Sequence, residues 1–211
     1  MELKKSKWED TQYMTTLAVL IAVVAVFQLF LGQIRVGPVT LTFVLLPIVV
    51  GAVILGPEAG AILGFVFGAI VLIQGITGQD HFTFVIFQAH PVTTSLLCVG
   101  KGVAAGGCAG LVYKLLRKKN ETVAAVAAAA TAPVVNTGLF ILWGLLLVRD
   151  TLSANLATFS WSGDSVLLFL IIGCAGINFL VEFALNVILS PVIVRVMQAV
   201  RQQGGSRSLD D

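Results

Sequence analysis

The chain has 211 residues, of which 57% are hydrophobic and only 11% are charged, and its net charge is +2. An ordinary soluble domain is about one-quarter charged, so this composition excludes a soluble globular fold. Disorder requires low hydrophobicity and high charge, and a nucleic-acid-binding face requires clustered basic residues, so these classes are excluded too. The sequence therefore predicts an all-α integral membrane protein.

Six apolar runs are candidates to cross the hydrocarbon core of a bilayer, which is about 30 Å thick and requires about 20 helical residues. They cover residues 14–31, 41–55, 59–76, 84–116, 122–148 and 166–197. The second run is short and contains Pro47, so we expect a tilted or broken helix there. The fourth run, which contains Pro91, and the sixth run both exceed one span. Each should therefore include a helical extension or a connecting segment.

The distribution of lysine and arginine predicts the orientation, because basic residues concentrate in cytoplasmic segments. With the N-terminus inside, ten of the thirteen basic residues fall on the cytoplasmic side, and only Arg35 and Arg149 fall outside. An even number of spans then places the C-terminus inside as well. We expect a cytoplasmic N-terminal segment (1–13), a six-helix membrane domain (14–200) and a flexible cytoplasmic tail (201–211).

Glycines recur every four residues in two of the runs. The two rows are Gly56, Gly60, Gly64 and Gly68, and Gly102, Gly106 and Gly110. In lipid, such small residues let two helix backbones approach closely. We expect these rows to pack inside the bundle, and a surface on which another protein slides or docks is the alternative.

Several well-known enzymatic motifs are absent from the sequence. It contains no phosphate-binding G-x-x-x-x-G-K-[ST] loop and neither H-E-x-x-H nor G-x-S-x-G. His81 and His90 have no cysteine or carboxylate at ligand spacing other than Asp80. We therefore expect neither a metal site nor a cofactor.

A few polar residues interrupt the apolar runs, where a charge at the bilayer centre costs at least about 2.5–3.5 kcal/mol. Lys101 and Asn136 lie near the middle of the fourth and fifth runs, and Asn178, Glu182 and Asn186 are spaced by four on one face of the sixth. Two interpretations stay open. Lys101 and Glu182 form an ion pair that fixes helix packing, or these groups line an outward-opening cavity that binds a small polar solute.

The predicted outer connections add further polar residues that could reach such a cavity, and pockets for small ligands combine apolar walls with a few polar groups. The candidate substrate-binding residues are Lys101, Asn136, Asn178, Glu182, Gln74, His90 and Arg35.

Two stretches carry a resemblance to a known family. Residues 41–70 combine a proline in a short helix, a Gly-Pro turn and a glycine-spaced helix, and residues 100–119 place small residues between Lys101 and a basic end. In these stretches, and over about residues 12–200, the chain resembles the substrate-binding (S) components of energy-coupling factor (ECF) transporters.

The resemblance implies a function, a location and a set of partners. The chain would not be an enzyme but a high-affinity subunit in a prokaryotic plasma membrane that captures a vitamin or related micronutrient from outside. It would dock on a membrane coupling (T) subunit, and two ATPase subunits would supply the energy. The family's first helix carries an A-x-x-x-A docking motif, which Ala18 and Ala22 match.

The resemblance defines the substrate less closely than it defines the class of transporter. The overall pattern is nearest to pantothenate-type and generic S components, and Lys101 could meet a ligand carboxylate. Biotin, folate, a pyrimidine precursor and a queuosine precursor stay open as substrates. The alternative functions are a stand-alone carrier or channel and an intramembrane enzyme that acts on a lipid through Glu182 and a histidine.

Overall fold

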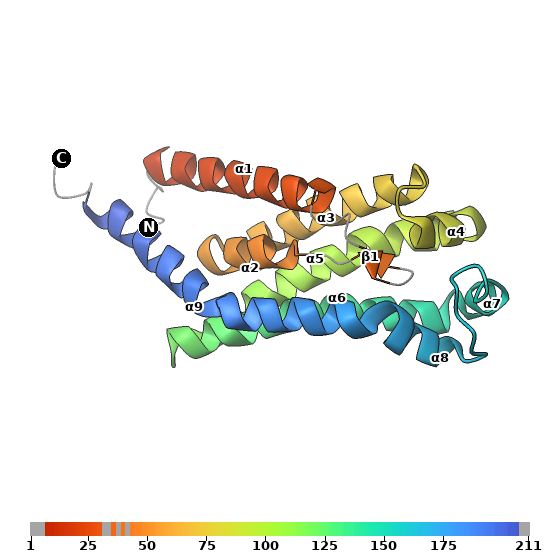
Figure 1. The fold of residues 1–211 in the computed structure, drawn as a ribbon. Coiled ribbons are helices and arrows are strands. Elements are labelled where there is room, and N and C mark those ends of the chain that lie inside the picture. The colour runs from red at the N-terminus through yellow and green to blue at the C-terminus, as the bar shows by residue number, and fades with distance from the viewer. Residues whose placement is uncertain (1–6, 31–34, 37–38, 41–42, 207–211) are drawn as a thin grey trace.

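The computed structural model describes residues 7–30, 35–36, 39–40 and 43–206, and most of these are helical (Figure 1). The long helices lie side by side and comprise α1 (Lys7–Phe30), α3 (Pro57–Ile76), α5 (Pro91–Leu116), α6 (Glu121–Leu146) and α9 (Ile177–Ser206). The shorter elements are α2 (Leu45–Ile54), α4 (His81–Ala89), α7 (Arg149–Ala154), α8 (Val166–Leu168) and the π-helix η2 (Phe169–Gly176). β1 (Arg35–Val36) and β2 (Val39–Thr40) form a small antiparallel pair that the sequence did not predict.

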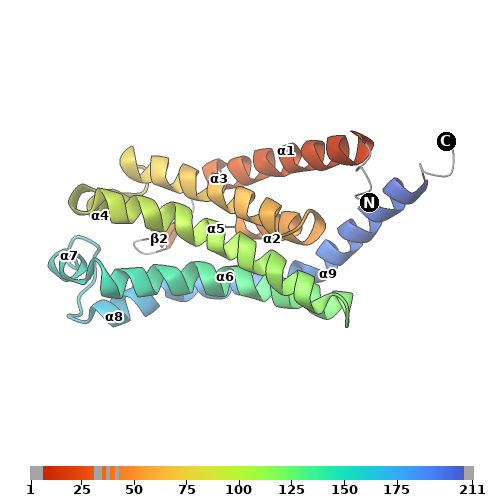
Figure 2. The same cartoon turned by 180° about the vertical axis from the view of Figure 1, so that it is seen from behind.

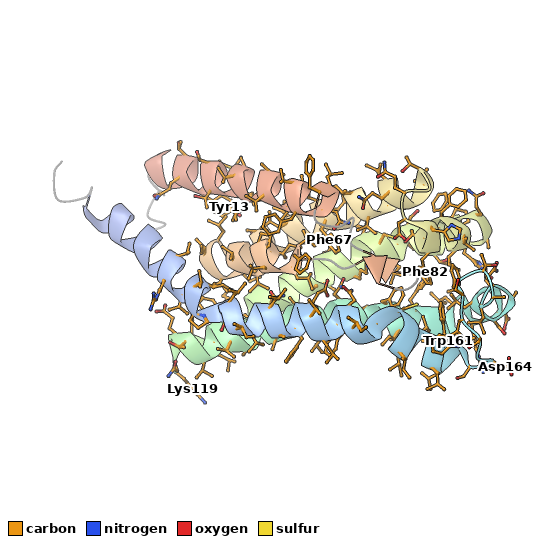
Figure 3. All side chains as sticks on the ribbon, viewed as in Figure 1. Tyr13, Phe67, Phe82, Lys119, Trp161 and Asp164 are labelled. Carbon is orange, nitrogen blue, oxygen red and sulfur yellow. The ribbon has the colours of Figure 1, made fainter. Side chains whose placement is uncertain are left out.

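Two views of the bundle show the same division into two ends. The start of α1 and the end of α9 lie at one end, and α4, α7 and α8 lie at the other (Figures 1 and 2). The short helix α2 occupies the half nearer the start of α1, and the strand pair lies in the half nearer α4. Lys119, in the basic connection between α5 and α6, lies at the end of the bundle where α1 starts and α9 finishes (Figure 3). Trp161 and Asp164 lie at the opposite end, near α4.

Within the described residues, five helical segments are long and apolar enough to cross a membrane, and they correspond to five of the six predicted spans. The exception is α2, whose ten residues extend only about 15 Å at 1.5 Å per residue. Its buried residues, among them Leu45, Ile48 and Val49, make it an internal helix rather than one surrounded by lipid. The fold is thus a helical membrane bundle, and a count of six full spans is not confirmed.

The two overlong runs contain the expected extra segments. The fourth run divides into α4 and α5 at His90, because the residue before a proline is disfavoured in helical geometry. The sixth run contains α8, η2 and α9 in succession. Helix α9 continues to Ser206, further than the apolar run predicts, and its last part points away from the bundle (Figures 1 and 2). Pro191 lies inside this helix, and a proline is a common cause of a helix kink.

The glycine rows pack inside the bundle, as the sequence predicts, and the structure brings them together as the contact between α3 and α5. A Cβ atom added at Gly60 would overlap the backbone of Gly106, and one added at Gly64 would overlap the backbone of Gly102. Gly68 meets the backbone of Cys98 in the same way, so Cys98 continues the α5 row. We call this contact the α3–α5 seam. It is internal, so these residues do not form the alternative surface for another protein.

Gly56 differs from the rest of its row. Its φ angle is +104°, and nothing lies within 4 Å of an added Cβ atom. It is the N-cap of α3, immediately before Pro57. Gly56 therefore permits the turn between α2 and α3 and does not belong to the seam.

Candidate functional site

A cavity of about 80 Å³ lies between α1, α3, α5, α6 and the η2–α9 segment, and α4 closes one side. One water requires about 10–15 Å³, so the cavity has room for several waters or for part of a small ligand. Figure 3 shows Phe67, which lines the cavity, near the middle of the bundle and Phe82, which also lines it, nearer α4. The cavity therefore extends from the middle of the bundle toward the α4 end.

Lys101 lines this cavity from the middle of α5, next to the α3–α5 seam. Its Nζ atom lies 5.8 Å from the ring centroid of Phe67 and 5.7 Å from that of Phe140. An ammonium group within about 6 Å of an aromatic face is stabilised by the ring quadrupole. Lys101 is thus held between two rings, and not against a carboxylate of the described residues.

Two predicted amides lie in the cavity wall near this lysine. Asn136 is on α6, three residues after Pro133, and is 5% exposed. Its Oδ1 atom has no hydrogen-bond partner among the residues that the structure describes. Asn178 lines the cavity from the first turn of α9. The three residues predicted from the middle of the apolar runs therefore meet at one site.

Gln28 was not among the predicted site residues, but it lines the cavity from the last turns of α1 and is 2% exposed. Its Nε2 atom donates a hydrogen bond to Oε1 of Gln74, at 2.8 Å. Gln74 was predicted to contact substrate, but it lies behind Gln28 and holds it in place. The available signal was an isolated amide in an apolar run, the same signal that identified Asn136.

Asp80 and Thr83 form a second missed part of the wall. Asp80 is the N-cap of α4, but its side chain makes no capping hydrogen bond to the backbone. Instead, its Oδ2 atom accepts a hydrogen bond from Oγ1 of Thr83 at 2.6 Å, and both residues line the cavity. Asp80 was considered only as a neighbour of His81 in a metal site.

Of the other predicted residues, Glu182 and His90 do not line the cavity. Glu182 is buried on α9, one turn beyond Asn178, where it is attracted electrostatically by Lys101. Nδ2 of Asn186, another turn along, donates to the backbone oxygen of Glu182. Nε2 of His90 lies 2.7 Å from Oγ1 of Thr151, which ties the start of α5 to α7. Arg35 lies in β1 opposite Thr40, and its side chain is outside the described part of the chain.

Aromatic rings enclose the cavity at its α4 end. Phe82 and Phe140, which both line it, have ring centroids 5.6 Å apart. Phe82 also contacts Phe159, whose ring stacks on that of Phe169 at 5.5 Å. The described lining thus combines apolar and aromatic surface with Lys101, Asp80, amides and hydroxyls, as expected for a site that binds a small polar ligand.

Helix α1 has a buried face and an exposed face. Leu17, Val24 and Gln28 are buried against the bundle. Ala18 and Ala22, the predicted docking residues, are exposed on the other face. The two alanines are therefore available to lipid or to another protein.

A helical membrane bundle whose described cavity wall contains a lysine beside aromatic rings is compatible with a membrane protein that binds a small solute. Residues 12–194 match the family described as "ECF transporter, substrate-specific component". The match covers most of the chain, so the chain belongs to this family. Membership assigns it to transport, and not to the enzymatic alternative, and makes it a multi-pass membrane protein.

A comparison with a curated protein agrees with this assignment. The chain is 28% identical over 210 residues to the "Pantothenic acid transporter PanT" of Lactococcus lactis subsp. cremoris (strain MG1363). The aligned region covers 94% of this chain and 98% of that protein.

Proposed function

We propose that this chain is the subunit of an ECF importer that binds pantothenate in the cavity beside Lys101. The observation that carries the proposal is the position of this lysine, the one cation among the described residues of the cavity wall. Pantothenate has one carboxylate, an amide, hydroxyl groups and a branched apolar centre. Lys101 would bind the carboxylate, Asn136 and Asn178 the amide, and the rings of Phe67 and Phe140 the apolar part.

The experiment is a direct binding measurement on the purified chain. We expect native mass spectrometry or calorimetry to show one pantothenate per chain, with biotin and folate as matched acidic vitamins that bind more weakly. Protein shown to be folded that binds none of these compounds would contradict the proposal. Binding of biotin or folate in place of pantothenate would change the substrate but keep the cavity as the site.

We propose further that the chain crosses a prokaryotic plasma membrane six times, with α2 and the segment before it forming the incomplete second crossing. The proposal is supported by the common end of the bundle at which α1 starts and α9 ends (Figures 1 and 2). It keeps a membrane domain at 14–200 between cytoplasmic segments 1–13 and 201–211. Lys119 lies at the same end, as positive residues on the cytoplasmic side require.

This topology makes a prediction about accessibility. Reporter enzymes that are active only in the cytoplasm, fused separately to the two termini, should both be active. A reporter inserted after Asp164, at the opposite end, should be silent. Activity at one terminus only would mean an odd number of crossings and would exclude the proposed topology.

The partners that we propose are a membrane coupling subunit and two ATPase subunits, because the chain itself has no phosphate-binding loop. Contact with the coupling subunit would use the exposed face of α1 that contains Ala18 and Ala22. Small side chains on this face would allow a partner helix to approach closely.

Ala22→Trp should therefore prevent assembly with the coupling subunit while pantothenate affinity stays within about threefold, less than 1 kcal/mol. Co-purification of the coupling and ATPase subunits measures assembly, and calorimetry measures binding. Ala184→Trp is the matched control, because Ala184 is an exposed alanine on α9. Normal assembly of Ala22→Trp, or equal loss in both variants, would contradict docking through α1, as would unaided uptake by the chain alone in liposomes.

A further inference from the structure

The cavity has two polar walls of different character. Lys101 and Asn136 belong to the wall formed by α5 and α6, and Lys101 is the one cation among the described lining residues. Gln28, Asp80 and Thr83 belong to a different part of the lining, formed by α1, the α3–α4 connection and α4, which we call the second wall. The proposed function gives no role to these three residues. We call the three residues of the second wall the acceptor wall.

Gln74 holds the acceptor wall together from behind. Its side-chain oxygen accepts from Nε2 of Gln28 at 2.8 Å, and its backbone oxygen accepts from the backbone nitrogen of Asp80 at 3.0 Å. Gln74 is 6% exposed and does not line the cavity. One buried residue thus fixes α1 and the start of α4 relative to each other.

These contacts engage the hydroxyl donor of Thr83 and one of the two N–H donors of Gln28, and they leave acceptors. Gln28 directs its Nε2 to Gln74, and its Oε1 is buried without a hydrogen-bond partner among the described residues. Thr83 gives its hydroxyl hydrogen to Asp80, whose carboxylate has acceptor atoms only. A buried acceptor without a partner destabilises the empty site, and a ligand that brings a donor removes this penalty.

We propose that the acceptor wall is a subsite that recognises hydroxyl groups of the ligand, a role that rests on the proposed function of the cavity. The ligand class is then a hydroxy acid with its carboxylate and its hydroxyls at opposite ends. Such a ligand binds in one orientation, with the carboxylate at Lys101 and the hydroxyls at Gln28 and Asp80. Pantothenate has this arrangement, because its hydroxyls lie at the end remote from its carboxylate.

The test compares two ligands on variants of the acceptor wall. The probes are pantothenate and a deoxy analogue in which hydrogen replaces its hydroxyl groups. The variants are Gln28→Met and Asp80→Asn, which conserve size but remove an acceptor. Gln88→Met is the matched control, because Gln88 is an exposed glutamine on α4. Affinities are measured by calorimetry on the purified full chain.

We expect the unmodified chain to prefer pantothenate to the deoxy analogue by about 10- to 100-fold, the range of one or two buried hydrogen bonds. Each acceptor-wall variant should lower this preference about tenfold by weakening pantothenate alone, and Gln88→Met should leave it unchanged. Measuring both ligands on the unmodified chain and on each variant gives a thermodynamic cycle. The cycle separates hydroxyl recognition from folding, because a structural defect weakens the binding of both ligands equally.

Two results would overturn the subsite and are distinguishable from failure of the proposed function. Equal binding of the two probes by the unmodified chain would remove the subsite but keep pantothenate as substrate. Equal loss of the two probes in Gln28→Met and Asp80→Asn would make the acceptor wall purely structural. If the folded chain binds no pantothenate, the proposed function fails, and the subsite fails with it.

Discussion

Replacing Lys101 by methionine is expected to weaken pantothenate binding by about 2–5 kcal/mol, the usual loss when one partner of a buried charge pair is removed. The ligand carboxylate would enter the cavity without its cation, while the rings of Phe67 and Phe140 remain. Methionine keeps the length and the apolar stem of lysine, so the packing against these rings is largely conserved. Calorimetry on the purified chain measures the difference in affinity.

The alcohol analogue of pantothenate, which has no carboxylate, provides the control. The lysine should discriminate the acid from the alcohol, and Lys101→Met should bind the two compounds with similar affinity. If Lys101→Met binds pantothenate as tightly as the unmodified chain does, Lys101 has a structural role only. A second replacement, Glu182→Gln, alone and combined with Lys101→Met, would show how much of the effect passes through the attraction between the two residues.

Replacing Gly64 by alanine is expected to destabilise the whole bundle by at least about 1–3 kcal/mol, because the added methyl group overpacks a close contact. The new Cβ atom would meet the carbonyl group of Gly102 and the backbone nitrogen of Val103. Backbone atoms cannot rotate aside as a side chain does, so the two helices must separate. Thermal denaturation in detergent, followed by circular dichroism, measures the loss.

Gly138→Ala provides the control for this prediction. Gly138 is also inside a long helix, but nothing lies within 4 Å of an added Cβ atom. Alanine there should leave the stability unchanged or raise it by about 0.4–1 kcal/mol, because it restricts the unfolded chain. Equal denaturation temperatures for Gly64→Ala and Gly138→Ala would mean that the α3–α5 seam is looser than the structure shows.

Most of the helical architecture was predictable because length and hydropathy determine which segments cross a bilayer. Pro91 marked the boundary between α4 and α5, and the glycine spacing indicated close packing inside the bundle, although not that the two rows meet. The limits of α2 were not predictable. Its apolar composition resembles that of a full span, but in the structure it is a ten-residue helix buried among the others. Hydropathy does not distinguish burial in protein from burial in lipid.

The sequence predicted how deep in the membrane the polar residues lie, but not toward which neighbouring helix each side chain points. Lys101, Asn136 and Asn178 were identified because polar groups in apolar runs require a compensating environment. A span that is apolar on all sides gives no information about which face points inward, so Gln28 was overlooked and Gln74 was assigned to the cavity instead. Glu182 was likewise predicted to face the ligand, but it lies one turn beyond the cavity. These distinctions depend on helix rotation, which only the three-dimensional structure supplies.

The π-helix η2 forms part of the cavity wall, and its geometry determines how the loss or gain of a residue would alter that wall. An α-helix closes hydrogen bonds over four residues and a π-helix over five, so η2 accommodates additional chain length without a loop. Losing one residue within Phe169–Gly176 would rotate the preceding residues by about 100° relative to Asn178, since a helix advances 3.6 residues per turn. Where the lost residue follows Cys174, this side chain would turn away from the cavity that it lines. A single-residue deletion or insertion could in this way alter the shape of the cavity without changing the order of the helices.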